Sequence, residues 1–338
     1  MKTKILIIGY GAMGMYLVPE LSARGYQVDV YSMEQGKDSF EGVTIHQANA
    51  FEEGFLKNLL ETGGYDAAVD FLMYATAEKF RKYYRLFLDN VRHYIFLSTY
   101  RIYANEEHPV KETSPRLLEV IQDPEYQATE DEYSRYKALE ENVLRESGYR
   151  NFSIIRPAIT YSKYRFQLVT LEAQVVIERA RKGKKIILPE KAMDVQATMS
   201  WAGDVAKMIA GLLLNPAAMG ETFSVCTAEH HTWREVAEYY KEITGMDYVT
   251  VDTETYYQLW ADSKYARYQL EYDRFFDRIM DNSKILTLTG LKQEELMPLK
   301  EGLRREFEAL PEGYTWPATP VNDRMDAWLE AHGERTGN

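Results

Sequence analysis

The first 160 residues or so alternate short apolar runs with longer amphipathic stretches. The apolar runs are rich in β-branched residues and too short for helices, so we expect strands at 5–8, 27–31, 43–46, 67–72, 94–97 and 152–155. Helical patterns lie between them at 13–24, 52–61, 77–90 and 132–147. This alternation predicts an α/β chain with a parallel sheet covered by helices on both faces, in a doubly wound Rossmann arrangement.

The first apolar run leads directly into a GxGxxG sequence that opens the first helical stretch. One glycine of such a motif makes the tight turn, one lets the backbone approach a pyrophosphate, and one lets the helix pack on the strand. The free N–H groups and the dipole of the helix N-terminus then hold the phosphates. The strand before the motif and the helix after it predict a dinucleotide site. Its expected residues are Gly9, Gly11, Ala12, Met13 and Gly14.

An acidic residue about 20 positions further on is expected to bind the adenosine ribose of NAD. The residue at the expected position is Ser32, whereas Asp29 lies within the strand and Glu34 comes slightly later. A hydroxyl tolerates the 2′-phosphate of NADP, but no arginine follows to bind it and the nearest cation is Lys37. NAD and NADP therefore both stay open, with a slight preference for NAD.

After Tyr161 the pattern loosens. We expect helices at 168–181 and 202–214, short strands at 185–188 and 221–225, and mainly helices from Thr232 onwards. A chain of 338 residues holds about two domains, and it contains no long Gly/Ser linker. We therefore expect a smaller, mostly helical substrate domain laced into the C-terminal half. Its expected residues are 162–195 and 227–338, and the dinucleotide-binding domain takes 1–161 with returning segments near 196–214 and 221–226.

The charge balance and the single cysteine exclude several partners and sites. Fifty-two acidic residues against 40 basic ones give a net charge of −12 without a basic cluster, which disfavours DNA. Cys226 alone forms no intrachain disulfide and no multi-thiolate metal site, which fits a reducing compartment. Because no stretch approaches the ~18 apolar residues of a membrane span, we expect a cytoplasmic protein without membrane contact.

A candidate catalytic group combines two helical residues with one at a strand end. Tyr133 and Lys137 lie four residues apart, so they share a helix face and the ammonium can stabilise a phenolate. With 26 tyrosines in the chain, this spacing alone arises easily by chance. Thr99, however, follows the fifth strand, at the sheet edge where α/β proteins bind ligands. Its hydroxyl is placed to bind a substrate oxygen that exchanges a proton with Tyr133.

Together these motifs resemble the extended short-chain dehydrogenase/reductases, also called the NAD-dependent epimerase/dehydratase family. The resemblance runs from residue 4 to about residue 226. Its further landmarks are Ser98 and Tyr103, Glu141, Ile155-Arg156-Pro157 leading to Tyr161, and Ser200 to Ala206. The segments 220–225, 232–235, 281–284 and 288–291 continue in the family's order.

The resemblance implies roles for individual residues. Thr99, Tyr133 and Lys137 would be the catalytic triad, with Tyr133 as the acid/base and Lys137 both stabilising its phenolate and holding the nicotinamide ribose. Asn49 takes the place of the aspartate that usually binds the adenine, and an amide oxygen accepts the same hydrogen bond. The resemblance also implies a homodimer through the helices at 77–90 and 132–147.

Departures from the family pattern reduce the number of reactions that the chain is expected to catalyse. Dehydratases usually carry Asp-Glu after the catalytic threonine, where this chain has Tyr100 and Arg101, so a dehydratase is disfavoured. Enzymes that epimerise two centres and then reduce use an extra cysteine and histidine near the substrate, but the only cysteine, Cys226, lies on a late strand, so this subclass is also disfavoured. Ile159 replaces an asparagine of many nucleotide-sugar epimerases, and 196–198 lacks their usual arginine. Recognition of a nucleotide diphosphate therefore stays open.

We expect no metal site, because the adjacent pair His230 and His231 points in two directions and the only nearby carboxylates spaced to complete a site are Glu229 and Glu235. The leading hypothesis is an NAD(P)-dependent epimerase or oxidoreductase that acts on a hydroxyl or keto group of a sugar or sugar-nucleotide-like small molecule. Epimerase and reductase are not distinguished. The alternative is a non-catalytic member of the fold, either a dinucleotide sensor or an RNA-associated protein, although the net charge disfavours RNA.

Overall fold

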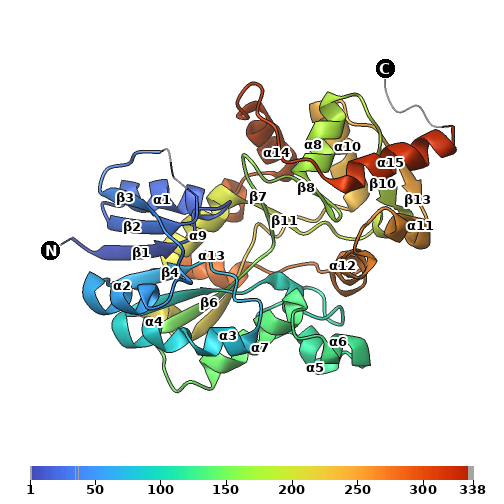
Figure 1. Cartoon of the computed structure of the whole chain (residues 1–338). Helices are drawn as coiled ribbons and strands as arrows, with labels where there is room; N and C mark the ends of the chain where they lie inside the picture. Colours follow the sequence, from blue (N-terminus) through green and yellow to red (C-terminus); the bar gives the residue numbers. More distant parts are fainter. Residues whose placement is uncertain (1, 35, 37, 334–338) are drawn as a thin grey trace. The chain divides into compact units, whose positions relative to one another are not determined.

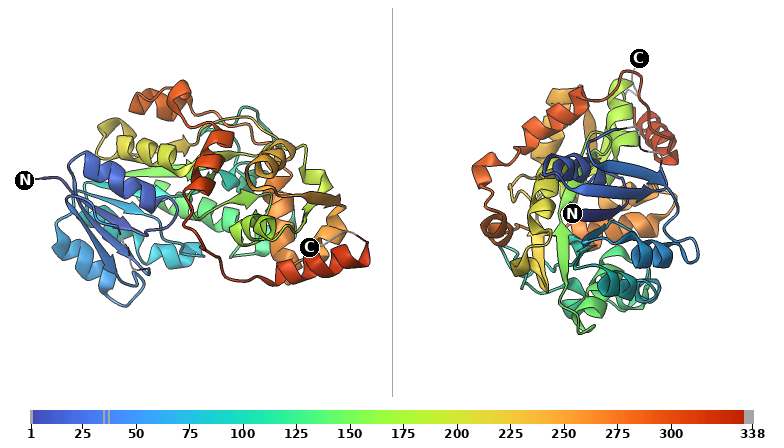
Figure 2. Two further views of the ribbon diagram at one scale, coloured as in Figure 1. Left: turned by 90° about the horizontal axis from the view of Figure 1, so that it is seen from above. Right: turned by 90° about the vertical axis from the view of Figure 1, so that its left-hand side faces the viewer.

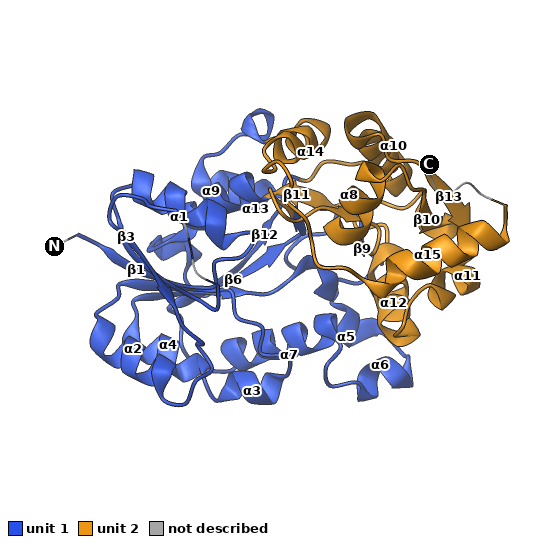
Figure 3. Cartoon of the chain, turned by 45° about the horizontal axis from the view of Figure 1, so that its top comes forward, with its two compact units in different colours: residues 1–160, 202–227, 280–296 blue, residues 161–201, 228–279, 297–338 orange. Residues whose placement is uncertain are grey.

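A computed structural model describes residues 2–34, 36 and 38–333, in two compact units (Figures 1 and 3). Unit 1 consists of residues 1–160, 202–227 and 280–296, and unit 2 of residues 161–201, 228–279 and 297–338. None of the helices in the described part of the chain has the length and apolar character that a membrane crossing requires.

Among the described residues of unit 1, seven strands form one sheet in the order β12-β6-β5-β4-β1-β2-β3. All neighbouring strands in this sheet are parallel. The strands are β1 (Lys4–Ile8), β2 (Gln27–Ser32), β3 (Val43–Gln47), β4 (Ala67–Asp70), β5 (His93–Leu97), β6 (Phe152–Pro157) and β12 (Glu221–Val225). The predicted doubly wound parallel α/β fold is confirmed.

Helices cover both faces of this sheet (Figures 1 and 2). One apolar cluster joins the sheet to α1 (Gly14–Ala23), α9 (Ala202–Leu212) and α13 (Ser283–Thr289). A second cluster joins its other face to α2 (Phe55–Gly63), α3 (Ala77–Arg81), α4 (Tyr84–Asn90) and α7 (Tyr133–Arg145). Adjacent strand residues alternate between the clusters, since Ile5 and Ile7 belong to the first and Leu6 and Ile8 to the second.

The strand order reverses between β1 and β4, and this reversal locates the site. From β1 the chain proceeds to β2 and β3 on one side, whereas β4, β5, β6 and β12 follow on the other. The carboxyl ends of these strands are level, because Ile8 pairs with Tyr31 of β2 and with Asp70 of β4. Ligands of doubly wound sheets bind beside the carboxyl ends of the strands at such a reversal.

Two expected helices begin or continue differently from the prediction. The helical pattern at 77–90 forms two helices, since α3 ends at Arg81 and α4 begins at Tyr84. The pattern at 168–181 begins as an antiparallel hairpin of β8 (Gln167–Leu168) and β9 (Leu171–Glu172), and α8 (Ala173–Arg181) follows. Val169 in the hairpin turn has a φ of +54°, a left-handed conformation that a continuous helix excludes.

Unit 2 is mostly helical, as expected, but it also contains short strands. Besides the β8–β9 hairpin, β10 (Ile186–Pro189) and β13 (Tyr248–Val251) pair in parallel. Its other helices are α10 (Trp233–Thr244), α11 (Thr253–Gln258), α12 (Ser263–Gln269), α14 (Leu299–Glu308) and α15 (Pro320–Ala331). Trp233, Tyr240 and Tyr256 are almost fully buried, so these aromatic side chains serve packing.

The units differ from the expected domain boundaries at two segments. Residues 196–201 belong to unit 2, whereas 280–296 return to unit 1. The physical reason for the second difference is α13, whose Ile285 is buried in the same apolar cluster as α9. Gly211 of α9 allows this close approach, because a Cβ there would lie 2.6 Å from the Thr289 side chain.

Candidate active site

The glycine-rich turn joins β1 to α1, and its three glycines meet different steric demands. Gly9 has a φ of +108°, which side chains rarely allow. A Cβ on Gly14 would lie 2.4 Å from the Gly9 carbonyl oxygen, so α1 starts this close to β1 only with glycine. At Gly11, by contrast, a Cβ would meet no heavy atom within 4 Å. Gly11 therefore leaves open space where a bound pyrophosphate would approach the backbone.

Ala12 and Met13 form the turn that leads into α1. Met13 already has helical backbone angles, and its carbonyl oxygen accepts a hydrogen bond of 2.9 Å from the Leu17 N–H. Met13 thus marks the helix N-terminus, whose first N–H groups lack intrahelical acceptors. These groups and the open side of Gly11 fit a dinucleotide phosphate.

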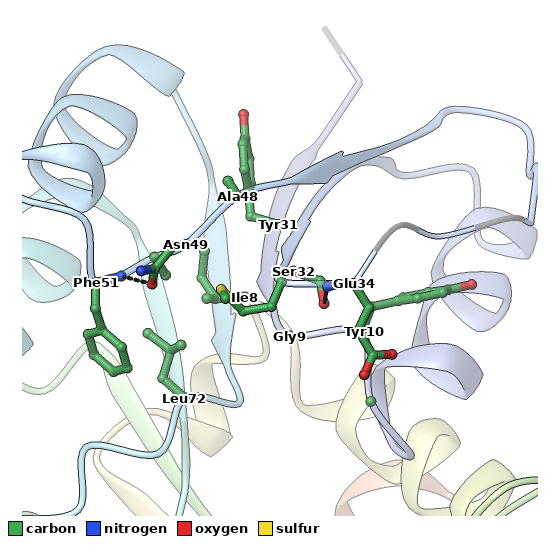
Figure 4. Close-up of a pocket in the computed structure, with 13 residues that line it drawn as sticks. Ile8, Gly9, Tyr10, Tyr31, Ser32, Glu34, Ala48, Asn49, Phe51 and Leu72 are labelled. Atoms are coloured by element: carbon green, nitrogen blue, oxygen red, sulfur yellow. Dashed lines mark hydrogen bonds between the residues drawn. The ribbon is translucent and has the colours of Figure 1, made fainter. Parts of the chain in front are cut away.

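A cavity of about 250 Å³ lies beside this turn (Figure 4). It is bordered by the ends of β1 and β2 and by the loops after β3 and β4. Its lining residues are Ile8, Gly9, Tyr10, Gly11, Tyr31, Ser32, Met33, Glu34, Ala48, Asn49, Ala50, Phe51 and Leu72. The cavity brings together four predicted cofactor residues, Gly9, Gly11, Ser32 and Asn49. The other five are Ala12, Met13 and Gly14 together with Tyr133 and Lys137, which the family resemblance also places at the cofactor, and none of them is among the lining residues.

Two polar residues of the cavity already make local hydrogen bonds. The Ser32 hydroxyl accepts one of 3.3 Å from the Glu34 N–H, and the Asn49 Oδ1 accepts one of 3.0 Å from the Phe51 N–H (Figure 4). The expected acceptor oxygen of Asn49 is therefore partly used, which leaves its amide N–H groups as donors for a base. Lys37, the cation considered for NADP, lies outside the described residues.

The apolar residues that line the cavity, among them Met33, Phe51 and Leu72, were not predicted as site residues from the sequence. Met33 is 65% exposed although it is apolar, and Phe51 and Leu72 are half-buried. Such side chains suit the faces of a planar ring like adenine. Their sequence signal is position alone, because each follows the end of a strand by no more than four residues.

Thr99 lies directly after β5 and is 4% exposed. It is the N-cap of the short 3₁₀ helix η1 (Tyr100–Ile102), and its Oγ1 accepts a hydrogen bond of 3.2 Å from the Arg101 N–H. The hydroxyl therefore caps a turn, and its own proton is left for another acceptor.

Tyr133 is the first residue of α7 and is half-buried. The helix starts here because the Glu132 carboxylate accepts a hydrogen bond of 2.8 Å from the Arg135 N–H. Arg101 contacts both Thr99 and Tyr133. Its backbone bonds to Thr99, its guanidinium carbon is 5.2 Å from the centre of the Tyr133 ring, and it pairs with Glu132 at 3.3 Å. Arg101 thus links Thr99 to Tyr133, a contact that the motif spacing did not predict.

Lys137 lies one turn further along α7 and is completely buried. Its Nζ donates a hydrogen bond of 2.9 Å to the Leu97 carbonyl oxygen at the end of β5. The same Nζ lies 3.0 Å from Oε2 of Glu140. The ammonium is therefore held at the carboxyl end of β5 by a carbonyl and a buried carboxylate.

A buried acidic cluster beneath Lys137 was also missed. Asp70, the last residue of β4, accepts hydrogen bonds from the Tyr74 hydroxyl (2.8 Å), the Tyr94 hydroxyl (2.7 Å) and the Leu72 N–H (2.9 Å). Burial raises the pKa of Asp70, while these donors and Lys137 oppose the rise. Burial and the charge of Asp70 raise the pKa of both tyrosines. The sequence signal for this cluster was Asp70 itself, an acidic residue at the end of an otherwise apolar strand.

Glu141, the neighbour of Glu140, has a separate partner. Its carboxylate accepts hydrogen bonds from Nε and Nη2 of Arg156, at 2.9 Å and 2.6 Å. It also accepts a hydrogen bond of 2.6 Å from the Ser98 hydroxyl. Although burial raises the pKa of Glu141, Arg156 and Ser98 together hold it below its usual value. These bonds fix α7 to the ends of β5 and β6.

The sequence matches no family model and no curated protein. Solved structures do match. An epimerase from Methanothermobacter thermautotrophicus is 12% identical with a TM-score of 0.70, covering 91% of this chain and 92% of that chain. UDP-glucose 4-epimerase from Thermus thermophilus, solved with NAD, is 18% identical with a TM-score of 0.62, covering 91% and 99%.

A short-chain dehydrogenase/reductase superfamily protein from Agrobacterium tumefaciens, solved with bound NAD, is 16% identical with a TM-score of 0.61. The match covers 98% of this chain and 100% of that chain. The likeness extends over nearly the whole length of the chain. The chain therefore has the fold of the extended short-chain dehydrogenase/reductases and NAD-dependent epimerases.

Proposed function

We propose that this protein is an NAD-dependent epimerase or oxidoreductase that acts on a hydroxyl or keto group of a sugar or sugar-nucleotide-like molecule. One observation carries the proposal. Within unit 1, Thr99, Tyr133 and Lys137 are connected through Arg101 and the end of β5, at the same sheet edge as the glycine-rich turn. Acid/base groups and a dinucleotide cradle at one sheet edge support hydride transfer coupled to proton transfer.

Each of the three residues has a chemical role in this proposal. The Tyr133 hydroxyl makes no hydrogen bond among the described residues, so it is available to exchange a proton with the substrate oxygen. The Thr99 hydroxyl would bind the same oxygen, and the charge of Lys137 would favour the Tyr133 phenolate. A bound nicotinamide would accept hydride from the substrate carbon and return it.

NAD is the dinucleotide that we favour. Glu34 is exposed and lines the cavity next to Ser32, where its carboxylate would repel the 2′-phosphate of NADP. The matching structures from Thermus thermophilus and Agrobacterium tumefaciens hold NAD.

Epimerisation is the reaction that we favour, with a sugar nucleotide as the first substrate class to test. Several of the matching structures are epimerases, among them a UDP-glucuronic acid 4-epimerase from Bacillus cereus. In an epimerase the dinucleotide is reduced and reoxidised within one cycle and need not leave.

The first experiment is to denature the purified protein and identify the released dinucleotide by absorbance and mass spectrometry. We expect close to one NAD per chain. An empty site that titrates preferentially with NADPH would contradict the epimerase and indicate a reductase.

The second experiment measures turnover on a panel of UDP-sugars and free sugars. Tyr133→Phe should abolish turnover while the dinucleotide still binds, because only the proton-transferring oxygen is removed. Tyr149→Phe is the matched control, since Tyr149 bonds to Asp89 on the surface. Dinucleotide binding without turnover on any substrate would instead favour the non-catalytic sensor.

A further inference from the structure

Two buried carboxylates, Asp70 and Glu140, both interact with the ammonium of Lys137. Asp70 is 1% exposed, and Glu140 and Lys137 are completely buried. The charge of Lys137 lowers the pKa of both carboxyl groups, and Asp70 in turn raises the pKa of Glu140. Glu141 does not share this cation, because it is paired with Arg156. One cation cannot compensate two buried negative charges, so one of the two carboxyl groups is expected to hold a proton.

The hydrogen bonds indicate which of the two holds it. Burial raises the pKa of Asp70, and hydrogen bonds from three donors oppose this rise by stabilising the ionised form. Neither oxygen of Glu140 accepts a hydrogen bond among the described residues. The Lys137 ammonium lies at ion-pair distance, 3.0 Å from Oε2, and lowers the pKa of Glu140. Glu140 is therefore the carboxyl group that depends on Lys137 for stabilisation of its negative charge, whereas Asp70 also has three other donors.

The groups around Glu140 agree with this assignment. Burial raises the pKa of Glu140 to about 7 although Lys137 opposes the rise. Asp70 on β4 and Glu141 on the same helix both add to the increase. Tyr74 after β4 and Tyr94 on β5 feel the charge of Glu140 but are neutral, since burial raises the pKa of both well above the usual value.

The charge of Glu140 affects Tyr133 through Lys137. Lys137 and Tyr133 are one helical turn apart on α7, and in the proposed function the charge of Lys137 acts on the Tyr133 oxygen. An ionised Glu140 at 3.0 Å cancels most of this field, whereas a protonated Glu140 leaves it in place.

We propose that Glu140 is a positioning residue for Lys137, whose carboxyl group holds the ammonium at the end of β5 and sets how much of its charge acts on Tyr133. The proposal rests on the proposed function, in which Tyr133 is the acid/base. In this arrangement protonation of Glu140 strengthens the action of Lys137 on Tyr133, and ionisation weakens it.

The first test follows Glu140 directly and needs no substrate. Infrared difference spectra of the full-length protein are recorded across pH, and the carboxylic acid stretch that is lost in Glu140→Gln is assigned to Glu140. We expect this signal to disappear as the pH rises through about 7. In Lys137→Gln the signal should persist to higher pH, because the compensating cation is gone. A Glu140 signal that is absent at mildly acidic pH, or that is unmoved in Lys137→Gln, would overturn the proposal.

The second test follows Tyr133. Tyrosinate absorbance is titrated in each background with and without Tyr133→Phe, and the difference isolates the Tyr133 phenol. In Glu140→Gln the midpoint should move to lower pH by about one unit, a tenfold change in the ionisation constant. Glu146→Gln removes an equal charge from the exposed end of the same helix and should leave the midpoint unchanged. Equal midpoints in Glu140→Gln and the control would show that Glu140 is only structural.

Where turnover is found, the acidic limb of the kcat profile should move with the phenol midpoint, and Glu140→Gln should have no further effect in the Lys137→Gln background. The two proposals fail separately. Absence of turnover contradicts the proposed function but leaves both titrations readable. A turnover profile that is identical in Glu140→Gln and in Glu146→Gln overturns the role of Glu140 and leaves the function standing.

Discussion

At the scale of single residues, two glycines of the glycine-rich turn are expected to serve different purposes, since Gly14 is required for packing and Gly11 leaves space for binding of the dinucleotide. Gly14→Ala should destabilise the protein by about 1–3 kcal/mol, because its Cβ would lie 2.4 Å from the Gly9 carbonyl oxygen. Gly11→Ala should change stability by less than about 0.5 kcal/mol, since its Cβ meets no heavy atom within 4 Å. The same Gly11→Ala should weaken NAD binding by tenfold or more. Thermal unfolding and NAD titration measure the two effects, and unchanged NAD affinity in Gly11→Ala would place the phosphates elsewhere.

Glu140 also links stability to pH. Its pKa is about 7 in the folded protein against 4.5 ordinarily. Below about pH 4.5 the group is protonated in both states, and between the two values the folded protein keeps a proton that the unfolded chain has lost. This contribution is therefore complete below about pH 4.5 and lost as the pH rises through about 7, by up to about 3 kcal/mol.

Urea unfolding of the wild type and Glu140→Gln at about pH 5 and about pH 8 measures this contribution. The amide does not titrate, so the variant should gain stability relative to the wild type at the higher pH. Glu146→Gln serves as the control. A difference between wild type and Glu140→Gln that is the same at both pH values would exclude the shift.

At the scale of elements, a buried histidine joins β5 to β6 and to the segment after α9. The Nδ1 of His93 accepts a hydrogen bond of 2.9 Å from the Leu214 N–H, and its Nε2 lies 2.9 Å from the Ser153 hydroxyl oxygen. A ring nitrogen that accepts from a backbone N–H is unprotonated, so the neutral Nε2–H tautomer fits both bonds. Burial lowers the pKa of His93 to about 4, which keeps the ring neutral near neutral pH.

The pKa shift of His93 therefore changes stability with pH in the opposite direction to that of Glu140. Its folded pKa is below the ordinary 6.5, so its contribution is present above about pH 6.5 and lost as the pH falls towards 4, by up to about 3 kcal/mol. His93→Asn keeps an acceptor for Leu214 and does not titrate. The variant should lose about 1 kcal/mol at neutral pH with the Ser153 contact, yet lose less than the wild type on acidification. Urea unfolding across pH checks this, and parallel pH curves would refute it.

At the scale of the whole molecule, the homodimer stays a prediction. The described residues of α3, α4 and α7 expose no large apolar side chain, because those found exposed are Met33, Met73 and Tyr265. A dimer through these helices would thus be polar. We expect light scattering to give twice the 39.3 kDa of the chain at low salt and a smaller mass at high salt. A single-chain mass at low salt would contradict the dimer.

The sequence predicted the central sheet well because each strand carries its own local signal. The six short β-branched runs before residue 160 all contain strands of the structure, and β4 alone ends two residues earlier than expected. The prediction from sequence was poorer where the same apolar pattern is compatible with two different secondary structures. The amphipathic run at 77–90 does not show where α3 ends, and the apolar residues at 168–171 fit a hairpin as well as a helix.

The sequence by itself determined the doubly wound sheet, the place of the glycine-rich turn and the spacing of Tyr133 and Lys137 along one helix. These features depend on local periodicity and on steric demands within a few residues. Only the tertiary structure decided that Arg101 contacts both Thr99 and Tyr133, and that Asp70 and Glu140 both interact with Lys137. Those contacts join residues up to 70 positions apart, and burial, which fixes their charges, exists only once the sheet and α7 have packed together.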